Sequence, residues 1–142
     1  MIRLRPGHSI RRAWRLIELV REKRIHRKFM MYARSDTIVN NPDLMEALKD
    51  IGLEYLLVGI ESFKDAELTN LNKNLTSRTN LEAVRLLKKL GIQISPHLIV
   101  NPEFSRADFR DLFRGVREME LFRPVYTVLT PLPVTVSGRP AV

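Results

Sequence analysis

The chain of 142 residues contains no cysteine. It therefore cannot form a disulfide, supply a thiolate ligand to a metal or use a cysteine nucleophile. No apolar run approaches the roughly 20 residues that a membrane-spanning helix requires. No apolar stretch follows the basic start of the chain, as it would in a signal peptide. Together with an ordinary hydrophobic content of 44%, these absences predict one globular domain in the cytoplasm.

Aromatic residues are scarce at 7%, which bears on the meaning of the net charge of +8. The excess charge is confined to residues 1–28, which carry ten Lys or Arg and two acids. Such a segment either contacts phosphates of nucleic acid or of an anionic membrane surface, or forms the solvated face of one helix. Trp14 is the only aromatic residue there that could stack on a base. The helical spacing of the charges favours the second alternative, and no specific nucleic-acid partner is expected.

Residues 1–27 are expected to form a basic leader followed by an amphipathic helix. Pro6-Gly7 and the lack of periodicity indicate that residues 1–8 have no regular structure, so the chain is expected to open on a helix without a preceding strand. Apolar residues at helical spacing predict that helix over about residues 10–24, with Trp14 in the core.

Four short apolar runs then have the pattern of strands buried in a parallel sheet. They cover residues 28–34, 54–61, 92–100 and 124–130. Pro96 lies inside the third run, where it removes one donor from the hydrogen-bond ladder. The regular alternation with helical segments nevertheless favours a strand at this position.

Amphipathic helices are expected between these strands. Asn41-Pro42 begins one of them, and Gly52 ends it in the left-handed conformation; Gly91 ends the next. Ser105 and Asp108 have the spacing of a capping box. The helix that follows is expected to bury an apolar face of Phe109, Leu112, Phe113 and Val116.

The spacing of the strands is that of βαβ units with right-handed crossovers. We therefore expect an α/β fold, a partial (β/α) barrel of about four parallel strands with outer helices. It is expected to span residues 28–135 and to be followed by a loose tail over residues 136–142. Its two open edges invite pairing with another chain.

Polar residues follow each strand, and parallel strands bring their C-terminal ends to one edge of the sheet. Glu61 and Ser62 come directly after the central apolar run. Glu61 is either a functional group at this edge or a cap or ion-pair partner of the next turn. Arg34 and Asn101 occupy the same position after the neighbouring strands, and Thr130 is expected beside them.

With these elements placed, the chain resembles the radical S-adenosylmethionine superfamily. Within it, the resemblance is greatest to the branch that carries an upstream cobalamin-binding domain, and there to the methylases acting on hopanoid lipids. The match covers about residues 28–135. It is carried by Tyr32–Ile38, Leu57–Ser62, Leu71–Lys73, Leu90–Ile92 and Thr130–Pro133.

The resemblance implies that the four strands are the last four of a six-stranded partial barrel. It implies that Glu61 and Ser62 lie near the ribose or methionine portion of S-adenosylmethionine, and it places the strand from His97 to Asn101 against the adenine. The expected cofactor-binding residues are thus Arg34, Glu61, Ser62, His97, Asn101 and Thr130.

Several features of that superfamily are missing here. Its [4Fe–4S] cluster is held by a CxxxCxxC loop, and this chain has no cysteine. The glycine-rich element is absent, His97 and Asn101 stand where glycines are usual, and Pro133-Val134-Thr135 replaces a Pro-Gly-Thr. The chain is therefore expected to be the C-terminal part of a barrel, from a split or truncated gene. The cluster and cobalamin are expected only in a full-length relative.

Three hypotheses follow from the sequence. In the first, the chain is a fragment of a methylase-like radical S-adenosylmethionine enzyme, inactive alone and without catalytic residues or metal ligands of its own. Its partner is then a cluster-bearing N-terminal half, or a second copy joined through the open sheet edges. In the second, residues 1–28 make it a basic binding module for nucleic acid or an anionic membrane surface. In the third, it is a remnant without function.

Overall fold

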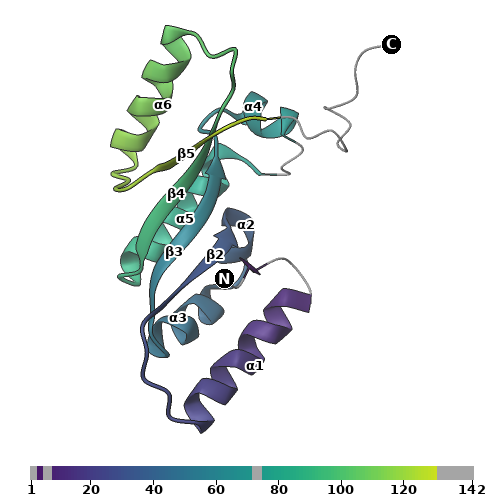
Figure 1. The fold of residues 1–142 in the computed structure, drawn as a ribbon, viewed down its shortest axis with the longest axis vertical. Helices are drawn as coiled ribbons and strands as arrows, with labels where there is room; N and C mark the ends of the chain where they lie inside the picture. The colour runs from purple at the N-terminus through teal and green to yellow at the C-terminus, as the bar shows by residue number, and fades with distance from the viewer. Residues whose placement is uncertain (1–2, 5–7, 72–74, 131–142) are drawn as a thin grey trace.

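The computed structural model describes residues 3–4, 8–71 and 75–130. Within these ranges the chain forms one curved sheet in the order β1-β2-β3-β4-β5, with helices packed along it (Figure 1). Asn72 and Lys73, Pro133-Val134-Thr135 and the tail over residues 136–142 lie outside the described residues.

All pairs of neighbouring strands are parallel, which confirms the predicted fold class. The four predicted strands are all present, with bounds within two residues of those expected. The strands are β1 (Arg3–Leu4), β2 (Phe29–Arg34), β3 (Leu53–Glu61), β4 (Gln93–Val100) and β5 (Val125–Val128).

The additional strand β1 corrects the prediction for the first eight residues. Arg3 and Leu4 pair with Tyr32 and Ala33 of β2, so a strand precedes the first helix. Two residues carry no detectable periodicity, and the pairing partner is supplied by the edge of β2. This is a tertiary contact that local sequence patterns do not reveal.

Six helices are formed by the described residues. They are α1 (His8–Glu22), α2 (Ser35–Val39), α3 (Pro42–Asp50), α4 (Asp65–Asn70), α5 (Ser77–Lys89) and α6 (Arg106–Glu118). The short α2 was not predicted, because its five residues are too few to show a helical period. Gly52 and Gly91 have φ of +108° and +64°, and Ser105 with Asp108 forms the capping box, as predicted.

Helix α1 has the amphipathic character that its charges predicted. Arg11, Arg12, Arg15 and Arg21 are exposed, whereas Ala13 and Ile17 are buried. Trp14, however, is 38% exposed, so its predicted place in the core was wrong. The buried stripe is centred on Ala13 and Ile17, one position to the side of the indole.

The core lies between the sheet and the helices. Leu56, Val58 and Ile60 of β3 are fully buried, as are the facing side chains of α3 and α5. Alternate β3 residues, Tyr55 and Leu57, are only half-buried and belong to the opposite, inner face of the sheet. Pro96 sits within β4 and is buried, and the β3–β4 register shifts between Gly59 and Glu61.

The C-terminal part of the described chain is much more exposed than the sequence predicted. Phe109 and Phe113 of α6 are 49% and 60% exposed, and only Val116 of this helix is buried. The predicted apolar face is therefore wrong for both phenylalanines, whereas Val116 is buried and Leu112 packs against the core. All four residues of β5, an edge strand, are exposed as well. Among the described residues, no helix is both long enough and apolar enough to cross a membrane.

Candidate site at the C-terminal edge of the sheet

The predicted site residues lie along one edge of the sheet, where the parallel strands end. Arg34 is the last residue of β2, Glu61 is the last residue of β3, and Asn101 directly follows β4. Thr130 follows β5 by two positions. The shared edge was predicted from the strand order and is confirmed by the parallel pairing. A cofactor-binding role for these residues stays a prediction.

Among the four residues at the strand ends, Glu61 is the most enclosed. The residue is 5% exposed, and its side chain lies over Gly59 on the inner face. A Cβ atom built on Gly59 would come within 2.9 Å of Glu61 Oε1 and 2.8 Å of Tyr32 Oη. The absence of a side chain at Gly59 therefore creates the space in which the carboxylate and the phenol converge.

The backbone at Glu61 is strained. Its φ is +65°, and the amide of Ser62 donates to the carbonyl of Ile60 at 2.8 Å. A hydrogen bond from residue i+2 to residue i around a positive φ defines a γ-turn of the rare, strained kind. A non-glycine residue in this region costs about 1–3 kcal/mol, and such strain collects at functional sites.

Asn80 of α5 contacts both ends of this turn. Its Nδ2 donates to the carbonyl of Ile60 at 2.9 Å and to that of Ser62 at 3.2 Å. Two such hydrogen bonds contribute about 1–3 kcal/mol together, similar to the cost of the strained turn. Asn80 thus offsets the strain that holds Glu61 in place.

Ser62 begins the connection from β3 to α4. Its hydroxyl donates to Glu67 Oε2 at 2.5 Å and accepts from the amide of Lys64 at 3.0 Å. Ser62 is also 3% exposed. These contacts fix the path of the chain immediately after Glu61.

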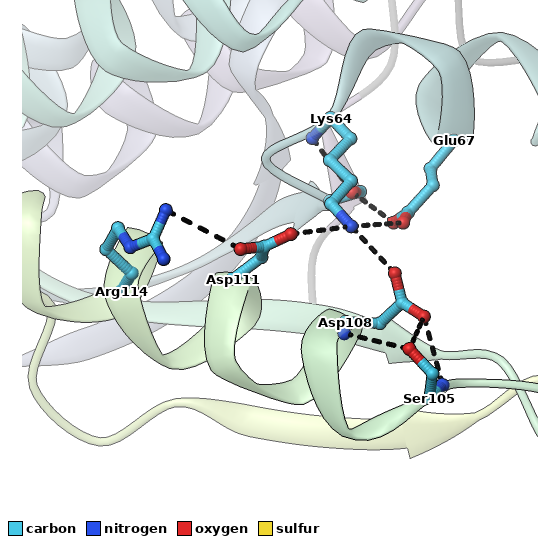
Figure 2. Close-up of polar contacts among 7 residues, drawn as sticks. Lys64, Glu67, Ser105, Asp108, Asp111 and Arg114 are labelled. Atoms are coloured by element: carbon cyan, nitrogen blue, oxygen red, sulfur yellow. Dashed lines mark hydrogen bonds and ion pairs between the residues drawn. The ribbon is translucent and has the colours of Figure 1, made fainter.

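An ion-pair cluster of Lys64, Glu67, Asp108 and Asp111 joins this connection to α6 (Figure 2). Lys64 Nζ lies 2.8 Å from Asp108 Oδ1 and 3.0 Å from Asp111 Oδ2. Hydrogen bonds from Lys64 to these carboxylates raise the pKa of Lys64 above its usual 10.5. Hydrogen bonds from Lys64 and Ser105 lower the pKa of Asp108 below its usual 3.8. Lys64 and Asp108 are therefore both charged near neutral pH.

Arg34 forms a bidentate ion pair with Asp36, which follows it closely in the chain. Its Nε and Nη2 donate to the two carboxylate oxygens of Asp36 at 3.1 and 2.9 Å. Asp36 Oδ1 also accepts from the amide of Thr37 at 2.7 Å, in the first turn of α2. This bidentate pair fixes the guanidinium at the edge of the sheet.

His97 lies within β4, before the C-terminal end of the strand, and its side chain is on the inner face. It is level with Gly59 of β3, and its Nε2 lies 2.6 Å from Thr127 Oγ1 of β5. The ring of Tyr32 meets the imidazole edge-on, with centroids 6.5 Å apart. Four adjacent strands thus place polar and aromatic groups on one face of the sheet.

Asn101 and Thr130 make local contacts beyond the ends of their strands. Asn101 Oδ1 accepts from the amide of Glu103 at 3.0 Å. Thr130 Oγ1 donates to the carbonyl of Val128 at 3.2 Å and is exposed. Both side chains stabilise turns leaving the edge, and Thr130 lies furthest from the buried part of the site.

Sequence analysis missed Asn80, Tyr32 and Thr127. Asn80 gave a signal that could have been used, because it shares the buried helical stripe with Ala83, Val84 and Leu87. An amide at such a position needs hydrogen-bond partners. Tyr32 and Thr127 gave none, since their contacts depend on the register between strands.

Comparison with known proteins bears directly on this arrangement. The model of the radical SAM superfamily matches residues 15–115. This chain belongs to that superfamily. The matched residues include β2, β3 and β4 with the helices between them, so most of the site described above lies within the radical SAM part of the chain.

Curated relatives include methyl-transferring enzymes. The hopanoid C-3 methylase of Methylococcus capsulatus is 26% identical over 120 residues, covering 84% of this chain and 23% of the relative. The bacteriochlorophyllide d C-8(2)-methyltransferase of Chlorobaculum tepidum is 25% identical over 132 residues, covering 91% and 29%. The chain thus spans about a quarter of the length of the curated relatives it matches.

Solved structures share the fold. The cobalamin-dependent S-adenosylmethionine radical enzyme OxsB superimposes with a TM-score of 0.68 at 21% identity, covering 86% of this chain and 19% of that chain. The radical S-adenosylmethionine methyltransferase TsrM from Kitasatospora setae gives 0.71 at 14% identity, covering 92% and 27%. The predicted resemblance to the radical SAM superfamily is therefore confirmed, and the chain shares its fold with these two cobalamin-linked enzymes.

The residues present have the chemistry to bind S-adenosylmethionine but not the chemistry to hold a [4Fe–4S] cluster. The polar edge with Glu61, and the aromatic inner face with Tyr32 and His97, match the mixed chemistry of a nucleoside bearing an amino acid. A [4Fe–4S] cluster does not fit, because it needs thiolate ligands and the chain has none. Among the described residues, no group of three metal-ligating side chains was found either.

Proposed function

We propose that this chain forms the S-adenosylmethionine-binding half of a methylase-like radical SAM barrel and that it is inactive without a cluster-bearing partner. The observation that carries the proposal is the buried Glu61, held in a strained turn at the C-terminal end of the central strand. Strained, enclosed carboxylates at this end of parallel strands are typical of ligand-binding positions. The cytoplasmic location stays a prediction.

The roles proposed for the site residues follow from their chemistry. The carboxylate of Glu61 accepts hydrogen bonds from ribose hydroxyls or from the methionine ammonium group. Tyr32 and His97 lie on the inner face, where a purine can stack or pack edge-on. Arg34 and Asn101 lie at the edge, within reach of the polar ends of the cofactor, and Ser62 shapes the turn.

The partner must supply what the chain lacks. It carries the cysteine ligands of the cluster, either elsewhere on the same polypeptide or on another one. The open edges at β1 and β5 offer unpaired backbone groups for it, and the exposed β5 side chains are consistent with an interface there. Cobalamin, if used, is bound by the partner.

The proposal is tested by calorimetric titration with S-adenosylmethionine. The chain is titrated alone and after assembly with the cluster-bearing N-terminal part of a relative such as the hopanoid methylase of Methylococcus capsulatus. We expect binding by the assembly, and weak or no binding by the chain. If the assembly forms and carries its cluster but does not bind the cofactor, the proposed function is wrong. Light scattering of the chain alone distinguishes pairing with a second copy.

A further inference from the structure

We propose that Asn80 is a positioning residue that holds the Ile60–Ser62 turn and thereby fixes the place of the Glu61 carboxylate. The importance of this placement for cofactor binding rests on the proposed function. The coupling between Asn80 and the turn does not, because it is a property of the chain itself.

The first argument is the geometry of the amide. Its two N–H groups are directed at two carbonyls, those of Ile60 and Ser62, which flank Glu61. The same Ile60 carbonyl also accepts the hydrogen bond that closes the γ-turn. One side chain therefore fixes the carbonyls on both sides of the residue with φ of +65°.

The second argument is the place of Asn80 in α5. It is fully buried and belongs to a stripe whose other members are Ala83, Val84 and Leu87. Its Oδ1 is buried without a hydrogen-bond partner in the structure. An apolar residue of similar size would pack there without an unsatisfied acceptor. The two hydrogen bonds from Nδ2 explain why a polar residue occupies this position despite its unsatisfied Oδ1.

The third argument concerns the turn without the bridge that Asn80 forms, that is, without its two hydrogen bonds to Ile60 and Ser62. A non-glycine residue leaves a positive φ when nothing enforces it. Glu61 would then relax to an ordinary conformation, and its Oε1 would leave the space above Gly59 that it shares with Tyr32 Oη. Replacing Asn80 should therefore displace the Glu61 carboxylate, although Glu61 itself is not altered.

A double-mutant cycle on the whole chain tests the inference without any ligand. Asn80→Leu removes both donors, and Glu61→Gly removes the strain, because glycine adopts a positive φ freely. We expect Asn80→Leu to raise the unfolding equilibrium constant about tenfold in the Glu61→Gly chain, where nothing offsets the lost hydrogen bonds. In the natural chain the factor should be about threefold or less, because the turn relaxes and releases its strain. An equal factor in both chains would overturn the inference.

Val84→Ala is the matched control. Val84 is buried on the same stripe but has no bond to the turn, so its effect should be the same with and without Glu61→Gly. Should Asn80→Leu fail to fold, Asn80→Ala takes its place in the cycle. NMR couplings that report the sign of φ give a second measurement: Glu61 should lose its positive φ in the Asn80 variant and keep it in Val84→Ala.

Cofactor affinity then links the bridge to the site. In the cluster-bearing assembly, Asn80→Leu should weaken S-adenosylmethionine binding at least about tenfold, and Val84→Ala should leave it unchanged. Unchanged affinity in the Asn80 variant would show that the bridge has no role in binding. If the assembly with the unsubstituted chain binds no cofactor, the proposed function is wrong. The double-mutant cycle still decides whether Asn80 holds the turn.

Discussion

Lys64 Nζ and Asp108 Oδ1 lie 2.8 Å apart although 44 positions separate the two residues in the chain. The other oxygen of the same carboxylate accepts from the hydroxyl of Ser105 and caps α6. Asp108 thus takes part in the cap of α6 and also attaches this helix to the segment that follows Glu61. Val116 is the only buried residue of α6 and Leu112 is partly buried against the core, so this attachment adds a polar contact to limited apolar packing.

The first prediction concerns this attachment. Lys64→Met should loosen α6, because it removes the ammonium group shared by Asp108 and Asp111 while keeping a side chain of similar length. Hydrogen exchange followed by mass spectrometry should show faster exchange in α6 and unchanged exchange in α3. Lys89→Met is the matched control, since Lys89 is exposed on α5. Equal protection of α6 in both variants would contradict the account.

The second prediction is the response of α6 to pH. The pKa of Asp108 is lowered in the folded chain, so its contribution is present above its usual 3.8 and is lost as pH falls below that value. The pKa of Lys64 is raised, so its contribution is present below 10.5 and is lost only as pH rises above it. Exchange in α6, corrected for the intrinsic rate, should therefore be constant between these limits. It should increase at acidic pH in the natural chain and increase less in Lys64→Met, where only the hydrogen bonds from Ser105 still lower the pKa of Asp108.

The third prediction compares two glycines that both have a positive φ. A Cβ at Gly52 would lie 2.2 Å from the backbone oxygen of Arg27, whereas one at Gly91 meets nothing within 4 Å. Gly91→Ala should thus cost only the conformational penalty, about 1–2 kcal/mol. Gly52→Ala should cost more, because the backbone must also move. Urea unfolding gives both values, and the reverse order would contradict the structure.

The βα alternation, the strand order and the helix ends were predictable from local patterns. Asn41-Pro42, Gly52 and the Ser105 capping box each act through backbone geometry within a few residues. The shared edge of Arg34 and Glu61 also followed, since parallel strands place their ends together.

The contacts within the site were not predictable in the same way. Strand β1 and the Tyr32–His97 contact depend on register between distant segments. The exposure of Trp14 and Phe113 depends on how each helix is rotated against its neighbours, which periodicity determines only to within about one position. The buried position of Asn80 could be predicted from its helical stripe, but the turn that its amide contacts could not.

The fourth prediction concerns the cluster. Reconstitution of the chain with iron and sulfide should give no stoichiometric iron–sulfur absorbance, because no thiolate is available. The cluster-bearing partner treated in the same way is the positive control. A coloured, stoichiometric cluster on this chain alone would show that other ligands hold it.

The central claim is that Glu61 contacts S-adenosylmethionine, and one titration tests it most directly. In the cluster-bearing assembly, Glu61→Ala should weaken cofactor binding by about 1–3 kcal/mol, the usual cost of removing a buried hydrogen bond to a charged group. Lys89→Ala, at an exposed position of α5, should leave the affinity unchanged. An affinity for S-adenosylmethionine that is the same in Glu61→Ala, Lys89→Ala and the natural assembly would contradict the account.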